Sequence, residues 1–76
     1  MPAKKSAAAQ ALGQAIRSAR EERGVSQETF AAHMGLDRSY YGAIERGEFN
    51  ITLATILKVT AGLGTRPSSL LRRAQL

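Results

Sequence analysis

The sequence predicts an all-α fold, a single compact domain of five helices. The first observation is periodicity, because apolar residues recur at helical spacing in each segment and no stretch alternates as a half-buried strand does. The second is helix termination, since four glycines follow the predicted helices: Gly24, Gly35, Gly47 and Gly64. The third is size, because 76 residues without cysteine suit one small domain whose core has no disulfide to support it.

The first predicted helix follows a short basic arm. Residues 1–6 carry two lysines and little to bury, so they are expected to form a flexible leader. From residue 7 to about residue 23 the pattern is helical, and Leu12 and Ile16 lie on one face. Arg20 borders that face, so its guanidinium must reach a carboxylate or water. No apolar run is long enough for a signal peptide or a membrane span, and the chain is expected in the cytosol.

The central pattern is two short helices joined by a glycine turn. Ser26 is suited to cap the first helix, because its hydroxyl can accept from an unpaired backbone N–H. Gly35 permits the left-handed conformation of the turn, and Asp37 is suited to cap the second helix, which ends at Gly47. A helix, a short turn with glycine and a second helix are typical of a DNA-binding helix-turn-helix, here over residues 27–46.

Two further helices are predicted after this pair. Residues 53–63 carry an apolar stripe wide enough to cover more than one neighbour. Leu57 and Val59 lie on opposite flanks of the stripe, so one of the two is expected to serve a partner subunit. Gly62 costs about 1 kcal/mol against alanine, which predicts fraying near the helix end. Pro67 suits the first turn of a last short helix, where its missing N–H is no loss.

The charge balance favours a polyanionic partner. Lys and Arg number 11 against 6 for Asp and Glu, and the pI is about 10.5. This excess points to nucleic acid first and to an anionic membrane surface second. An enzyme is rejected, because one histidine, no cysteine and no clustered carboxylates leave no acid–base or nucleophilic constellation. The same composition predicts no metal site and no cofactor.

The first turns of the second helix in the pair carry the side chains expected to meet DNA. Arg38, Ser39, Gly42 and Ala43 are expected to point outward, with Tyr40 alongside. Arg38 is predicted to read a base directly, because its planar guanidinium can donate twice to guanine. The Ala43 methyl is expected to touch a thymine methyl, while Ser39 and Tyr40 would bond a base edge or the DNA backbone.

Three more residues are candidates for phosphate contacts. Gln27 opens the first helix of the pair, where its amide and the free N–H groups of the helix can face a phosphate. Arg46 and Asn50 follow the second helix and are expected to hold phosphates that set the register of the protein on DNA. Tyr41, by contrast, repeats the apolar face and is assigned to the core.

Residues 12–71 resemble the lambda-repressor-like, Cro/Xre family of helix-turn-helix regulators. Three stretches carry the likeness: R-x-x-x-G-V-S-Q-E-T-F-A from residue 20, G-L-D-R-S-Y-Y-G-A-I-E-R-G-E from residue 35 and N-I-T-L-A-T-I-L-K-V from residue 50. They stand in the family's order and spacing, and the subtype is similar to the small controller proteins of restriction–modification systems. The resemblance implies the DNA-binding domain of this family over residues 7–76.

The resemblance also implies functions for particular residues. Family positions that contact DNA match Gln27, Arg38, Ser39 and Ala43. The glutamate that matches Glu45 often forms a partly buried ion pair with the arginine that matches Arg20, and the same strut is expected here. Phe49 departs from the basic residue common at its position, so one phosphate contact is missing or replaced by packing. The implied dimer interface lies on the last two helices and their connection, at Ile51, Leu57, Thr65, Pro67 and Leu70.

These observations predict a sequence-specific, double-stranded DNA-binding regulator of transcription that acts as a homodimer. Each protomer would place its recognition helix in one major groove, with the half-sites of a palindromic operator about 34 Å apart. The alternative is an antitoxin-like module that binds both DNA and a protein partner, since the fold also serves that use. RNA polymerase would be a further partner of an activator, for which Glu21, Glu22 and Glu28 offer an acidic patch.

Overall fold

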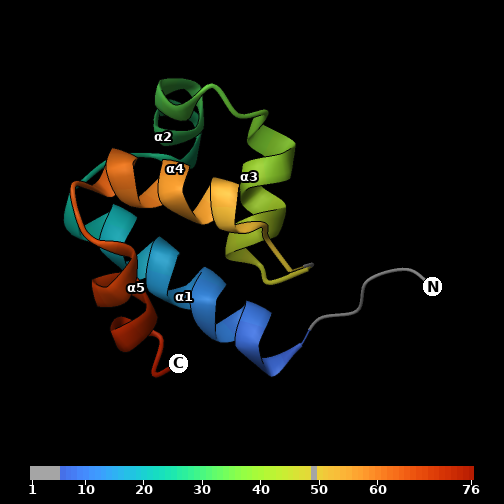
Figure 1. Cartoon of the computed structure of the whole chain (residues 1–76). Helices are drawn as coiled ribbons and strands as arrows, with labels where there is room; N and C mark the ends of the chain where they lie inside the picture. Colours follow the sequence, from blue (N-terminus) through green and yellow to red (C-terminus); the bar gives the residue numbers. More distant parts are fainter. Residues whose placement is uncertain (1–5, 49) are drawn as a thin grey trace.

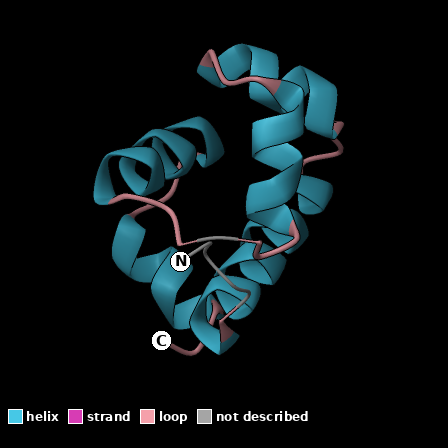
Figure 2. Cartoon of the chain, turned by 90° about the vertical axis from the view of Figure 1, so that its right-hand side faces the viewer, coloured by secondary structure: helices cyan, strands magenta, loops and turns pink. Residues whose placement is uncertain are grey.

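The computed structural model describes residues 6–48 and 50–76, and every regular element in these ranges is helical (Figures 1 and 2). The elements are α1 (Ala7–Glu22), α2 (Gln27–Met34), α3 (Arg38–Glu45), α4 (Leu53–Leu63) and α5 (Pro67–Arg73). The all-α, five-helix prediction is therefore confirmed over the described part of the chain. The arm predicted over residues 1–6 lies outside it except for Ser6, which caps α1, and Phe49 also lies outside it.

Side-chain caps explain where the helices begin. Four helices start after a residue whose side-chain oxygen accepts from a backbone N–H three residues on: Ser6, Ser26, Asp37 and Thr52. Each such bond satisfies a donor that has no partner within the helix. α5 has no side-chain cap and begins instead with Pro67, whose ring has no N–H to satisfy. Gly35 and Gly64 end α2 and α4 with φ angles of 71° and 69°, in the left-handed region that favours glycine.

The core lies where α1 crosses the other helices. α1 packs on α3, α4 and α5, while α2 packs on α3 and α4, and Figure 1 shows α3 along one edge of the bundle. The largest fully buried side chains are Tyr41, Ile16, Ile44, Leu70, Val59 and Thr60. The rings of Phe30 and Tyr41 meet edge to face at 5.4 Å, which joins α2 to α3 inside the core. The assignment of Tyr41 to the core is thus confirmed.

Gly13 allows the closest contact between α1 and α3. A Cβ atom at this position would lie 2.5 Å from the carbonyl oxygens of both Ile44 and Glu45. Backbone oxygens at the end of a packed helix cannot retreat as a flexible side chain can. Only a residue without a side chain therefore lets α1 hold the C-terminal end of α3 at this separation.

Gly62 does not fray the end of α4, contrary to the sequence-based expectation. The helix continues through it to Leu63, and a Cβ atom at Gly62 would lie 3.0 Å from Cε1 of Phe30 and 3.3 Å from Cγ of Met34. The glycine lies where α4 approaches α2, so its missing side chain makes room for neighbouring core residues. Tertiary packing here outweighs the low helix propensity of glycine.

Candidate nucleic-acid interface

The first turn of α3 presents three exposed side chains. Arg38, Ser39 and Tyr40 follow the cap residue Asp37, whose Oδ2 accepts from the backbone N–H of Tyr40 at 3.1 Å. Tyr40 is 36% exposed, which is high for a large aromatic side chain. The start of α3 therefore offers a guanidinium, a hydroxyl and a phenol to solvent, next to backbone N–H groups at the positive end of the helix dipole.

Gly42 and Ala43 are buried, so neither contributes to the exposed surface of α3, contrary to the sequence-based expectation. Ala43 is only 8% exposed. A Cβ atom at Gly42 would lie 3.0 Å from Nη1 of Arg46 and 3.7 Å from Oε1 of Gln27, so those side chains lie beside Gly42. The exposed part of α3 is thus its first turn.

The C-terminal end of α3 is held by a buried ion pair. Nε of Arg20 donates to Oε2 of Glu45 at 2.7 Å, and Nη2 donates to Oε1 at 3.2 Å. The two side chains are 9% and 1% exposed. Nη1 of Arg20 also donates to the carbonyl oxygen of Val25 at 2.6 Å. The pair ties α1 to the end of α3, as the resemblance implied, and the same guanidinium also holds the connection before α2.

Two further donors complete the surroundings of the Glu45 carboxylate. The hydroxyl of Tyr41 donates to Oε2, and the side-chain amide of Gln27 donates to Oε1 at 2.7 Å. The sequence indicated neither bond, because a polar residue at a helix start was expected to face outward. Gln27 is half-buried and links α2 to the same carboxylate that anchors α3.

These contacts shift the protonation equilibria of the cluster. Burial alone raises the pKa of Glu45, but the hydrogen bonds from Arg20, Tyr41 and Gln27 outweigh it and hold that pKa below its usual range. The hydrogen bond to Glu45 raises the pKa of Arg20. Burial, followed by the neighbouring carboxylate, raises the pKa of Tyr41, so its hydroxyl stays protonated. The cluster is thus a carboxylate–guanidinium pair with a neutral phenol.

The other two phosphate candidates lie on the surface after α3. Nε of exposed Arg46 pairs with Oε2 of Glu48 at 2.5 Å, and Oδ1 of exposed Asn50 accepts from Oγ of Ser6 at 3.2 Å. An exposed ion pair contributes only about 0–1 kcal/mol. The Arg46 guanidinium can therefore exchange its protein carboxylate for another anion at little cost.

The residues implied for a dimer interface differ in exposure and form three groups. Leu57 is 49% exposed on α4, and Leu53, which the expected interface did not include, is 69% exposed four residues earlier on the same helix face. Ile51, Thr65 and Pro67 are half-buried. Leu70 is only 2% exposed, so its assignment to an interface is wrong: it belongs to the core where α5 meets α1 and α4.

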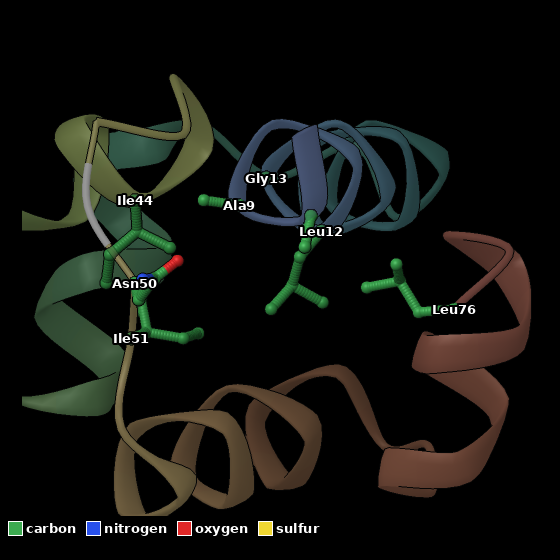
Figure 3. A pocket seen from close by; sticks show the side chains of 8 residues that line it. Ala9, Leu12, Gly13, Ile44, Asn50, Ile51 and Leu76 are labelled. Carbon is green, nitrogen blue, oxygen red and sulfur yellow. The ribbon is translucent and has the colours of Figure 1, made fainter. Parts of the chain in front are cut away.

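Ile51 lines a small, mostly apolar pocket (Figure 3). Side chains from α1, α3, the connection before α4 and the C-terminus converge there, among them Leu12, Ile44 and Leu76. The volume is about 90 Å³, well below the roughly 300 Å³ at which ligand pockets begin. The pocket is therefore a recess in the apolar surface and lacks room for an organic ligand.

The acidic patch expected for RNA polymerase is largely paired with arginines. Glu21 bonds Arg17 at 3.3 Å, and Glu22 bonds Arg73 of α5 at 2.8 and 2.9 Å. The hydrogen bond from Arg73 lowers the pKa of Glu22. Two of the three expected carboxylates are thus matched by positive charge on the protein itself.

Two other features concern residues 6–48 and 50–76, the part of the chain that the structure describes. Within these ranges no three His, Cys, Asp or Glu side chains come together in a group able to hold a metal ion. None of the helices in the same ranges has both the length and the apolar character that crossing a bilayer requires.

Comparisons with known proteins place this geometry in context. A family model described as helix-turn-helix, HTH_3, matches residues 16–70. Control protein C.MunI of Mycoplasma sp is 44% identical over 60 residues, 78% of this chain and 81% of that protein. Control protein C.SmaI of Serratia marcescens is 40% identical over 65 residues, 86% of this chain and 77% of that protein. The crystal structure of restriction-modification controller protein C.AhdI from Aeromonas hydrophila has a TM-score of 0.82 at 45% identity, covering 86% of this chain and 98% of that one.

Proposed function

The chain belongs to the helix-turn-helix family, and from this membership we propose that it regulates transcription by binding one specific sequence of double-stranded DNA. The resemblance that the motifs predicted is confirmed by the family match over residues 16–70. The observation that carries the proposal is the division of α3. Its first turn is exposed, while its last residue, Glu45, is fixed by three other side chains. A helix held at one end and open at the other suits insertion into a major groove.

Direct reading of bases falls to the exposed first turn. Arg38 donates two hydrogen bonds to the O6 and N7 atoms of a guanine, a pairing that its planar guanidinium matches in geometry. Ser39 and Tyr40 bond a neighbouring base edge or a phosphate. Ala43 is too buried for the thymine contact first expected of it, and we leave it out of the reading surface.

Phosphate contacts hold the helix in register. Gln27 keeps one amide N–H on Glu45, which fixes the side chain and leaves its other N–H for a phosphate. Arg46 releases Glu48 and donates to a second phosphate, while Asn50 bonds the backbone beyond it. These contacts position the protein and carry no sequence information of their own.

Two copies of the chain form the working unit in this proposal. Leu53 and Leu57 expose one apolar face of α4, and a second copy would cover this face. Pairing about a two-fold axis presents two recognition helices to a palindromic operator with half-sites about 34 Å apart. Leu57→Asp should shift the chain to a monomer in sedimentation at micromolar concentration. A dimer that persists in this variant places the interface elsewhere.

Control of a restriction–modification system is the biological setting that the relatives suggest. C.MunI and C.SmaI are control proteins, and C.AhdI is a restriction-modification controller protein. Control would take place in the cytosol, where the DNA lies, at promoters that include the chain's own. Whether the bound protein activates or represses depends on where its operator lies relative to the promoter.

Selection of bound fragments from a random DNA pool tests the proposal. Enrichment of one palindromic motif with a fixed half-site spacing is the expected result. Arg38→Ala should then cost roughly 1–3 kcal/mol and relax preference at one position of each half-site, whereas Arg46→Ala should weaken all sequences alike. A pool that shows no enriched motif after repeated rounds contradicts sequence-specific binding.

A further inference from the structure

A polar cleft of about 270 Å³ lies between α1 and the C-terminal end of α3. It is lined by Gln10, Gln14, Arg17, Glu45 and Arg46. The first three are exposed and stand four and three residues apart, so they share one face of α1. The sequence did not indicate a site on this face, because amides and an arginine on an alanine-rich helix are ordinary features of a solvated surface.

The backbone brings the two walls of this cleft together. In the turn after α3, Gly47 has a φ of 70°, and a Cβ atom there would lie 2.6 Å from Cα of Gln10. The turn therefore rests directly on α1. Together with the contact at Gly13 on the same helix, this fixes the position of Arg46 relative to Gln14 and Arg17.

The cleft continues the line of phosphate-binding side chains. Arg46 and Gln27 both lie beside Gly42, and Arg46 also lines the cleft. Polar side chains thus run without a break from the start of α2, past the end of α3, to the exposed face of α1. Donors arranged along a line suit an extended polyanion better than a single small ligand.

The length of α3 places this end of the line near the DNA backbone. α3 has eight residues, so Arg46 lies roughly 12 Å beyond Arg38 along the helix at a rise of 1.5 Å per residue. The major groove is also about 12 Å wide. When the first turn of α3 meets base edges, the other end reaches the phosphates at the rim of the groove, and the face of α1 lies beside them.

The charges of the cleft suit an anion that is not yet bound. The carboxylate of Glu45 is neutralised by Arg20, so it adds no net repulsion. Arg17 pairs with Glu21 at 3.3 Å, and these side chains are 58% and 56% exposed. Such pairs contribute little in water, whereas a phosphate can accept two parallel hydrogen bonds from a guanidinium.

We propose that this cleft binds a backbone phosphate of the operator DNA, so that α1 joins the helix-turn-helix in contacting DNA through Arg17 and Gln14. The inference rests on the proposed function, since it names a further contact in the same complex. The contact is with phosphate alone, and it therefore strengthens binding to every sequence alike. It also adds a third helix to the DNA-facing surface.

Salt titrations of DNA affinity test this assignment. Arg17→Ala should lower affinity roughly 3- to 10-fold for operator and unrelated duplex alike, and should reduce the slope of log K against log salt by about 0.9, the value for one phosphate. Gln14→Ala should lower affinity several-fold and leave that slope unchanged, because it removes no charge. Arg23→Ala is the matched control: it also removes one positive charge just after α1, but Arg23 lines a separate cleft with Phe30 and His33.

The possible outcomes separate this inference from the proposed function. If Arg17→Ala and Arg23→Ala shift affinity and slope equally, net charge alone is responsible and the cleft assignment is overturned, while sequence-specific binding by the intact chain stands. An Arg17→Ala effect confined to the operator also overturns it, because a phosphate contact cannot distinguish sequences. If the intact chain selects no motif, the proposed function itself fails. Urea midpoints close to that of the intact chain establish that each variant is folded.

Discussion

Arg20→Ala tests most sharply whether the buried ion pair holds the C-terminal end of α3. The change removes two hydrogen bonds to Glu45 and one to the carbonyl oxygen of Val25. It leaves a carboxylate that is 1% exposed without the charge that compensates it. Tyr41 and Gln27 still donate to the carboxylate, but neither carries a positive charge. An uncompensated buried charge, more than the lost bonds, should dominate the effect.

The expected cost is a large fraction of the total stability. Removing one partner of a buried ion pair destabilises by about 3–5 kcal/mol. A domain of 76 residues has a free energy of unfolding of roughly 4–11 kcal/mol, from about 0.05–0.15 kcal/mol per residue. With a urea m-value near 1 kcal/mol/M, the unfolding midpoint should fall by roughly 3 M or more. The variant is expected to be marginally folded at 25 °C.

Urea unfolding followed by far-ultraviolet circular dichroism measures this cost. Arg17→Ala is the matched control, because Arg17 also pairs with a glutamate but on the exposed face of α1, and it should change stability by about 0–1 kcal/mol. Arg20→Lys keeps the charge and loses the two-pronged geometry, so its stability should lie between those of the intact chain and Arg20→Ala. It stays measurable even if the alanine variant does not fold.

An equal midpoint for Arg20→Ala and Arg17→Ala would show that the buried ion pair does not stabilise the fold more than an exposed one. The buried and the exposed ion pair would then contribute equally to the free energy of unfolding. Another interaction would have to fix the end of α3. A loss of operator affinity in Arg20→Ala with no loss of stability would also contradict the structural role of the buried pair. In that case Arg20 would contact DNA directly and would not act through the position of α3.

Three further outcomes follow from the contacts around Glu45. Gly13→Ala should both destabilise the fold and weaken DNA binding. The added methyl group would lie 2.5 Å from the carbonyl oxygen of Glu45 and push α1 away from α3. Urea unfolding and an affinity titration on the same variant measure the two effects. Tyr41→Phe should cost about 1.5–3 kcal/mol in the same assay, the range for a hydrogen bond to a charged group, and less than Arg20→Ala because Arg20 still compensates the carboxylate. Folding lowers the pKa of Glu45 from about 4.5, so the ionised carboxylate stabilises the fold above that pH. This contribution is lost as the pH falls through the pKa of Glu45 in the folded state. Urea midpoints measured from pH 6 to pH 3 should therefore fall more steeply for the intact chain than for Glu45→Gln.

The helices could be predicted because residues close in sequence determine where each one begins and ends. The side-chain oxygens of Ser26 and Asp37 cap α2 and α3, as predicted. Gly35 and Gly64, which lack a Cβ atom, end α2 and α4 at positive φ. The three exposed side chains at the start of α3 follow from the same local signals. A cap fixes where the helix begins, and the residues after it face solvent unless another element covers them.

The remainder depends on contacts between helices, which periodicity does not encode. The inward orientation of the Gln27 side chain could not be predicted, because the sequence does not show that α2 begins beside Glu45. The burial of Leu70 and the close contact at Gly62 depend on how α5 and α4 pack. The polar face of α1 acquires significance only because the turn after α3 rests against it. In each case a residue with an ordinary local interpretation is given its function by a neighbour distant in sequence.

The exposed first turn of α3 has a consequence for how this protein can evolve. Arg38 and Ser39 are exposed at the surface, so exchanging either should alter the free energy of unfolding by only about 0.5 kcal/mol. If these two side chains read the operator as proposed, operator preference can change in single steps through variants that remain folded. A library confined to residues 38 and 39 would consist almost entirely of folded members, each anchored by the same Glu45 cluster. On the proposed function, the same fold would then bind other operators after changes at only two adjacent residues.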